Sequence, residues 1–193
     1  GKSVLIKIIY QLLKYDNGNI LYNGKKDVDI DNFSMLFQYG ALFDSLTISE
    51  NIAFTDFMDN KKNYTKKVNA LMKDVGLDNS NFNKYPSEIS GGMKKRAALA
   101  RALYKNPKVL FLDEPTTGLD PINSDLINEL IIKVIKKRKM TAVTITHDIK
   151  SAIKTGDNFY FIDKGITQEK GECNKILSTK NSVFKSFITG ARY

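Results

Sequence analysis

Two adjacent carboxylates follow a short apolar run in the second half of the chain. Residues 108–112 predict a strand buried on both faces of a parallel sheet, because the run is continuously apolar after its first lysine. In open α/β sheets, ligands bind at the carboxyl ends of the strands. There Asp113 is suited to hold Mg²⁺ through its water shell, and Glu114 to polarise an attacking water. The alternative is a strand that ends in two solvated acids before Pro115.

The chain opens with residues typical of a phosphate-binding loop. Gly1-Lys2-Ser3, followed by a predicted helix over residues 4–13, matches the end of G-x-x-x-x-G-K-[ST]. Backbone amides at a helix N-terminus hold phosphate oxygens, Lys2 would neutralise their charge, and Ser3 would offer its hydroxyl to Mg²⁺. Because the first glycine of the motif is absent, an ordinary helix cap is the alternative reading of these three residues.

A second helix start has the character of an anion site. Ser90 is a natural N-cap for a helix that runs to about residue 104, and Gly91 and Gly92 let another backbone approach closely. A nucleotide already has one such helix end in the loop at Gly1. Two copies of the chain that enclose two nucleotides would explain why there are two such helix N-termini. The alternative for the second one is an ordinary capped helix.

Gln38 and His147 also follow predicted strands, over residues 35–37 and 141–146 respectively. Both residues are therefore expected at the carboxyl edge that carries the two acids. Here His147 is suited to contact a γ-phosphate, and Gln38 to reach the metal or the attacking water. A structural histidine and an unremarkable glutamine are the alternatives.

Strands alternate with helices along the chain, which predicts an α/β fold with a mostly parallel sheet. A helical segment is inserted between Gln38 and Lys108 and is broken at Gly76, at residues 78–80 and at Pro86. The remaining predicted elements are a buried helix over 4–13, a turn at 16–18, a short strand over 20–22 with a break at 23–24, a helix over 121–137, a buried β-branched strand over 141–146, a helix over 149–154, and a strand over 159–162 followed by a turn at 164–165.

The chain has 193 residues, and 30 lysines and arginines against 21 acids give a formal charge of +9. Such a charge suits a nucleotide, a nucleic acid or an acidic membrane face. The alternative is a solvated surface, because the basic residues form scattered doublets and one run without interleaved aromatic residues. These lie at 25–26, 61–62, 66–67, 94–95 and 136–139.

The length and composition fit one globular domain and exclude several other classes. The single cysteine, Cys173, cannot form an internal disulfide, and His147 is the only histidine, so a zinc site is not expected. No apolar run reaches the ~18 residues of a membrane-spanning helix, and no signal peptide is visible. Because the chain begins at Gly1 inside a motif, we expect it to be a fragment.

The motifs together resemble the ATP-binding subunits of ABC transporters over the whole chain. The resemblance is carried, in order, by Gly1-Lys2-Ser3, Gln38, Ser90-Gly91-Gly92, Leu112-Asp113-Glu114-Pro115, Gly118-Leu119-Asp120 and His147. It implies a phosphate-loop NTPase core that lacks its N-terminal part, with an inserted helical subdomain over residues 45–105 within one domain over 1–193. ATP and Mg²⁺ are the implied cofactors.

The resemblance also implies a role for each residue that binds nucleotide. Gly1, Lys2 and Ser3 would close the Walker A loop, with Lys2 stabilising the transferred phosphoryl group. Ser3, Gln38 and Asp113 would hold Mg²⁺. Glu114 would be the general base for ATP hydrolysis.

Four further positions have implied roles at the dimer interface or the γ-phosphate. His147 would be the switch histidine. Ser90, Gly91, Gly92 and Met93 would contact the nucleotide of the opposite subunit, and Asp120 would lie in the D-loop across the interface of a homodimer.

A narrower resemblance is to the Mla-type ATPases, which drive phospholipid trafficking in Gram-negative envelopes. It rests on residues 1–5, 37–54, 90–103 and 187–190, and methionine at position 93 is typical of that branch. It implies a partner permease in the inner membrane, a cytoplasmic location on its inner face, and a lipid-domain binding protein in the complex. We expect residues 39–43 to contact the permease.

Two other functions remain open from the sequence. One is a soluble ABC ATPase that acts on DNA or the ribosome, which the +9 charge favours. No coiled-coil insertion or tandem domain supports it, so no nucleic-acid partner is expected. The other is a non-catalytic interaction module, which only the incomplete phosphate loop supports.

Overall fold

The central sheet has three parallel strands in the order β1-β2-β3. They are β1 (Phe33–Leu36), β2 (Val109–Asp113) and β3 (Thr141–Ile145) in a computed structural model that describes residues 2–26 and 29–190, with only the backbone of Lys2 and Ser3. A separate antiparallel hairpin joins β4 (Asn158–Asp163) to β5 (Ile166–Glu172). The predicted α/β class with a parallel sheet is confirmed.

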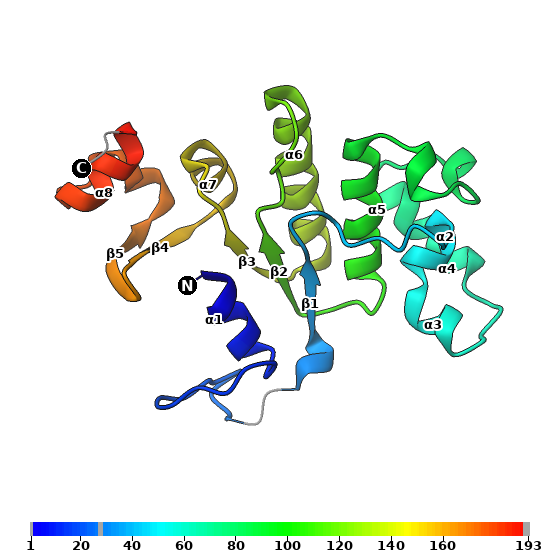
Figure 1. Cartoon of the computed structure of the whole chain (residues 1–193), viewed down its shortest axis with the longest axis horizontal. Helices are drawn as coiled ribbons and strands as arrows, with labels where there is room; N and C mark the ends of the chain where they lie inside the picture. Colours follow the sequence, from blue (N-terminus) through cyan, green and yellow to red (C-terminus); the bar gives the residue numbers. More distant parts are fainter. Residues whose placement is uncertain (1, 27–28, 191–193) are drawn as a thin grey trace.

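Figure 1 shows α2 to α5 gathered at one end of the molecule, and the β4–β5 hairpin with α8 at the other. The helices begin and end as follows: α1 (Lys2–Ile9), α2 (Ile48–Ile52), α3 (Phe54–Met58), α4 (Thr65–Asp74), α5 (Gly91–Leu103), α6 (Pro121–Arg138), α7 (Ile149–Thr155) and α8 (Ser182–Thr189). Short 3₁₀ turns occupy 30–32, 79–81, 86–88 and 173–178. The predicted helical breaks between α4 and α5 are confirmed.

The two faces of the sheet belong to two apolar cores. Leu36, Leu110 and Leu112 lie in the main core with residues of α5 and α6. On the opposite face Phe111 lies in a smaller core with Ile6 of α1. Residues 109–112 of β2 are all buried, which confirms the strand predicted to be covered on both faces.

Two elements predicted before β1, a helix and a strand, differ from the structure. The helix over 4–13 ends at Ile9, and it is not buried all round, because Val4 and Leu5 are 49% and 47% exposed. Only its Ile6 side packs on the sheet, and no other described element covers the outer side. The strand over 20–22 is reduced to one bridge between Tyr22 and Lys25.

β3 lies where predicted but is not buried. It is the last strand in the sheet order, so the described part of the chain offers a neighbour on its β2 side alone. Thr141 and Thr144 are therefore exposed, and Val143 is 41% exposed. Its β-branched composition correctly predicted a strand, but not how much of it is covered.

Candidate functional site

Glu114 leaves the carboxyl end of β2 in a conformation that non-glycine residues rarely adopt. Its φ is +48°, in the left-handed region, where a side chain costs about 1–3 kcal/mol. The backbone N–H of Glu114 donates to the Ile145 carbonyl at 2.9 Å. The pairing of β2 with β3 thus continues one residue past Asp113, while the turn directs the chain away from the sheet.

The Glu114 carboxylate contacts His147 directly. Glu114 Oε1 and His147 Nδ1 lie 2.9 Å apart, which joins the two residues that the sequence predicts at neighbouring strand ends. The Thr117 hydroxyl donates to Oε2 at 3.4 Å. The Glu114 side chain is 14% exposed and the His147 side chain 67% exposed. Glu114 is therefore largely covered by the protein, whereas the imidazole ring is open to solvent.

A buried polar chain fixes the segment that carries His147. Asp148 caps α7 by accepting from the Lys150 N–H at 3.0 Å. The Ser151 hydroxyl donates to the other Asp148 oxygen at 2.6 Å, and the Asn128 amide of α6 donates to Ser151 at 2.8 Å. Asn128 and Ser151 are buried, where satisfied hydrogen bonds hold a geometry firmly. α6 therefore anchors the start of α7, next to His147.

Gln38 and Asp113 lie at the same sheet edge on neighbouring strands. Gln38 follows β1 by two residues and Asp113 ends β2, and the strands pair Leu36 with Leu112. Both offer oxygen ligands, which Mg²⁺ prefers, usually with one or two protein ligands beside phosphate and water. The described residues contain no cluster of three histidine, cysteine, aspartate or glutamate side chains for a metal. The donors at this edge fit Mg²⁺ held jointly with a nucleotide.

Lys95 is a residue of this site that the sequence reading missed. By sequence it is one of the scattered basic doublets, at 94–95, but in the structure it is 7% exposed. Its ammonium group donates to the backbone carbonyl of Gln38. Burial lowers its pKa, and the nearby Glu114 carboxylate opposes that change. The missed signal is helical spacing, because Lys95 stands three, four and seven residues before buried Ala98, Leu99 and Ala102.

Ser90 and Asp120 each cap the start of their own helix. The Ser90 hydroxyl accepts from the Met93 N–H at 3.3 Å, as predicted for an N-cap. Asp120 accepts from the Asn123 N–H at 2.9 Å, and this bond, with one from the Asn123 side chain, lowers the Asp120 pKa. A Cβ at Gly92 would lie 3.8 Å from the Asn123 side-chain oxygen, so the starts of α5 and α6 are close together.

The predicted phosphate loop lies mostly outside the described residues. Gly1 is not described, nor are the side chains of Lys2 and Ser3. The backbone of Lys2 and Ser3 begins α1, in agreement with a helix that directly follows the loop.

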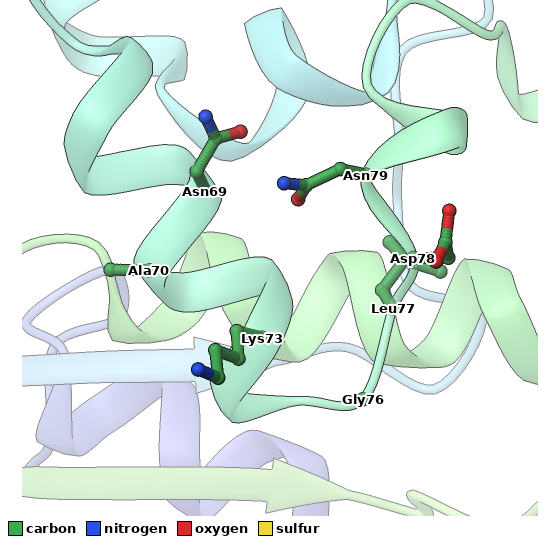
Figure 2. A pocket seen from close by; sticks show the side chains of 7 residues that line it. All are labelled: Asn69, Ala70, Lys73, Gly76, Leu77, Asp78 and Asn79. Atoms are coloured by element: carbon green, nitrogen blue, oxygen red, sulfur yellow. The ribbon is translucent and has the colours of Figure 1, made fainter.

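A cavity of about 610 Å³ lies apart from these residues, between α4 and the segment 76–79. Figure 2 shows Asn79 pointing towards Asn69 of α4, with Asp78 next to Asn79, while Lys73 lies lower on α4 and points away from Asn79. None of the predicted site residues lines it. The chemistry that the sequence predicts therefore concentrates at the sheet edge, not in this cavity.

Comparison with known proteins identifies the family. The family model described as ABC transporter matches residues 1–117. The chain is 31% identical over its whole length to "Probable ribonucleotide transport ATP-binding protein mkl" of Mycobacterium leprae, covering 58% of that protein. It is 34% identical to the chloroplastic protein Trigalactosyldiacylglycerol 3 of Arabidopsis thaliana, over 99% of this chain and 63% of that protein. The chain thus spans less than two thirds of each relative.

Two solved structures share the fold. CbiO1 of Clostridium perfringens, described as part of the ABC transporter complex CbiONQ, superposes with a TM-score of 0.82 at 28% identity, over 97% of this chain and 79% of that one. The ATP-binding cassette MJ0796, a dimer bound to ADP and Pi, gives 0.73 at 28% identity, over 90% and 81%. Within the described residues, no helix is both long and apolar enough to cross a bilayer. By its family match and its fold, the chain belongs to the ABC transporter family.

Proposed function

We propose that the protein hydrolyses ATP to drive an ABC transporter. The observation that carries this proposal is the 2.9 Å contact between Glu114 and His147 at the carboxyl edge of the parallel sheet. A carboxylate buried on one side and held by an imidazole is suited to orient and polarise a water molecule. MJ0796, which has the same fold, is described as bound to ADP and Pi after hydrolysis. Because these are the products of ATP hydrolysis, they support ATP as the substrate here.

In this mechanism the side chains act mainly by positioning and by stabilising charge. Glu114 accepts a proton from, or orients, the water that attacks the γ-phosphate in line. His147 holds the Glu114 carboxylate and offers its exposed ring to the γ-phosphate. Gly1, Lys2 and Ser3 would bind the phosphates, as expected for the end of a phosphate-binding loop.

Mg²⁺ fits the oxygen donors at this edge. Ser3, Gln38 and Asp113 would hold it, and when bound it would neutralise charge on the phosphate oxygens. Asp113 and Gln38 would help to orient the nucleotide relative to Glu114, because Asp113 ends β2 and Gln38 follows β1, the strand paired with it.

We further propose that two copies close around two nucleotides. Residues 90–93 and Asp120 of one copy would then contact the nucleotide of the other. The exposed start of α5 and its closeness to the start of α6 support a shared contact surface there. The dimeric MJ0796 structure supports the same arrangement. In it, residues 45–105 act as a helical subdomain.

Closure and opening would be transmitted to an integral membrane permease through residues 39–43. Tyr39 is 81% exposed and Phe43 is 45% exposed, and Phe43 stacks on Phe54 at 4.5 Å. Buried Asn51 fixes this loop by accepting from the Phe43 N–H at 2.8 Å and donating to the Phe43 carbonyl at 3.0 Å. Rigid, exposed aromatic residues are typical of docking surfaces. This attachment gives the protein a cytoplasmic location on the inner face of the inner membrane.

We propose a lipid, specifically a phospholipid, as the cargo. The Mla-like residues 37–54 and Met93 support this class, as does the lipid name of the Arabidopsis relative. A lipid-domain binding protein would then complete the transporter. The ribonucleotide in the name of the mycobacterial relative is the competing cargo.

A Glu114→Gln variant tests the proposed hydrolysis. In the full-length protein we expect kcat to fall by about 100-fold or more, because the amide cannot accept the proton from water. ATP binding and ATP-dependent dimerisation should persist, which gel filtration with Mg²⁺-ATP would measure. Wild-type turnover in this variant would exclude Glu114 as the base.

A further inference from the structure

Lys95 is buried between the loop that follows β1 and the residues that follow β2. It lies in the second turn of α5 and is 7% exposed, although lysine is rarely buried without a partner. The structure supplies one hydrogen-bond partner, the Gln38 carbonyl. Burial lowers the Lys95 pKa, and the charge of the Glu114 carboxylate opposes that change.

The Gln38 loop, residues 38–41, is held on α5 at three of its carbonyls. Arg101 donates to the Gly40 carbonyl at 2.6 Å and to the Ala41 carbonyl at 2.7 Å, and Lys95 holds the first carbonyl of the loop. Gly40 permits the close approach, since its φ is +76° and a Cβ there would lie 3.2 Å from the Ala98 Cβ. The loop and α5 therefore form one unit.

Lys95 holds this unit next to the strand end that carries the carboxylate proposed to act on water. The Arg101 contacts lie farther along α5, whereas Lys95 donates to the backbone carbonyl of Gln38, two residues after β1, and β1 pairs with the strand that ends just before Glu114. Without the ammonium, the Gln38 carbonyl would lose a charge-assisted hydrogen bond, and Glu114 would lose a neighbouring positive charge. Both losses would change how the expected metal ligand Gln38 and Glu114 sit relative to each other.

We propose that Lys95 is a positioning residue for ATP hydrolysis, which ties the Gln38 loop to α5 beside Glu114. This rests on the proposed function, because it presumes that Glu114 polarises the attacking water. Lys95 touches neither nucleotide nor water in this role. It fixes the separation between the loop that carries Gln38 and the carboxylate, on which in-line attack depends.

Steady-state ATPase kinetics on the full-length protein test the proposal. We expect Lys95→Met to lower kcat by about 10- to 100-fold while KM for ATP changes by less than about threefold, because small displacements of a reacting group have effects of that size. Lys95→Arg, which keeps a charged donor, should recover most of the lost kcat.

The matched control is Arg96→Met. Arg96 is the next residue of α5 and also donates to a carbonyl, that of Val75 at 2.7 Å, but it faces the α4 side. Its loss should lower the unfolding temperature without changing kcat more than about twofold. Equal kcat losses in Lys95→Met and Arg96→Met would overturn the proposal, because they would indicate general damage to α5.

A double variant separates this inference from the proposed function. In the Glu114→Gln background, Lys95→Met should reduce the residual turnover by less than about threefold, since residues that act as a unit are non-additive. Additive losses would overturn the role of Lys95. If Lys95→Met has a normal kcat while Glu114→Gln is inactive, the role of Lys95 is also overturned, but Glu114 remains the proposed base. A normal kcat in Glu114→Gln would instead overturn the proposed function.

Discussion

The backbone of Glu114 opposes the stability of the chain at the residue where the proposed chemistry lies. At φ +48° an alanine is strained and a glycine is not, although glycine costs more entropy on folding. We therefore expect Glu114→Gly to unfold with a free energy about 1 kcal/mol higher than Glu114→Ala. Both variants remove the contact with His147, so the comparison isolates the backbone. Urea denaturation measures it, and equal stabilities would mean that this turn carries no strain.

Single residues were predictable where their neighbours in sequence place them at a strand end. Glu114 and His147 meet because each follows a strand of one parallel sheet, and that requires only the pattern of apolar runs. Lys95 could not be assigned in the same way. Its burial depends on the Gln38 carbonyl and Glu114, which are 57 and 19 positions away along the chain, so charge alone suggested a solvated lysine.

At the scale of elements, one carboxylate joins the ends of α4 and α6. Asp74 accepts from Lys137 at 2.6 Å and from Arg138 at 2.8 Å, and the Asp74 side chain is 18% exposed. Burial acts to raise the Asp74 pKa, but the hydrogen bonds from both basic residues outweigh it and lower the pKa below its ordinary value. The middle of the 136–139 basic run is thus partly a structural contact and not only a solvated surface.

The direction of this shift gives a pH-dependent prediction. A carboxylate with a lowered pKa stabilises the fold fully above its unfolded pKa of about 3.9 and stops doing so as pH falls through the folded value. Asp74→Asn should lower the unfolding free energy by about 1–3 kcal/mol at pH 7, and by progressively less below about pH 4. The control is Asp59→Asn, whose pair with Lys61 is exposed, so its loss should change the unfolding free energy far less than the loss of Asp74 does. A difference that stays constant down to pH 2 would contradict the assignment.

Elements were predicted best where their stability is local. α6 begins at Asp120-Pro121 and runs close to its predicted end, because the cap and the proline mark the start. β3 was placed correctly and α1 ended four residues before its predicted end, but both were predicted to be buried. Burial is a property of the neighbours, and no described element covers the outer side of α1 or the far edge of β3. The strand over 20–22 failed because three apolar residues without a pairing strand cannot form a ladder.

At the scale of the whole molecule, the +9 charge is distributed rather than concentrated. Six basic side chains of the described residues pair with acids, which lowers the positive potential around them. Such pairs are Lys61 with Asp56 and Asp59, Lys105 with Asp31, Lys137 and Arg138 with Asp74, Lys154 with Asp125 and Glu129, and Lys175 with Glu172. A nucleic-acid interface needs a basic stripe that tracks phosphates. The charge therefore fits solubility and a general attraction to anions better than a function on DNA or the ribosome.

The exposed aromatic loop, residues 39–43, predicts a membrane-protein partner and not a nucleic acid. Tagged full-length protein, purified from gently solubilised membranes, should carry an integral membrane protein and a lipid-domain protein, and Tyr39→Glu should reduce the permease yield several-fold. Tyr39 is 81% exposed, so the substitution should leave folding intact, and Tyr160→Glu, at a position 67% exposed on β4, serves as the control. Recovery of nucleic acid or ribosomes without a membrane partner would overturn the transporter assignment. Recovery of the permease with both variants at equal yield would retain the transporter and move its docking surface away from Tyr39.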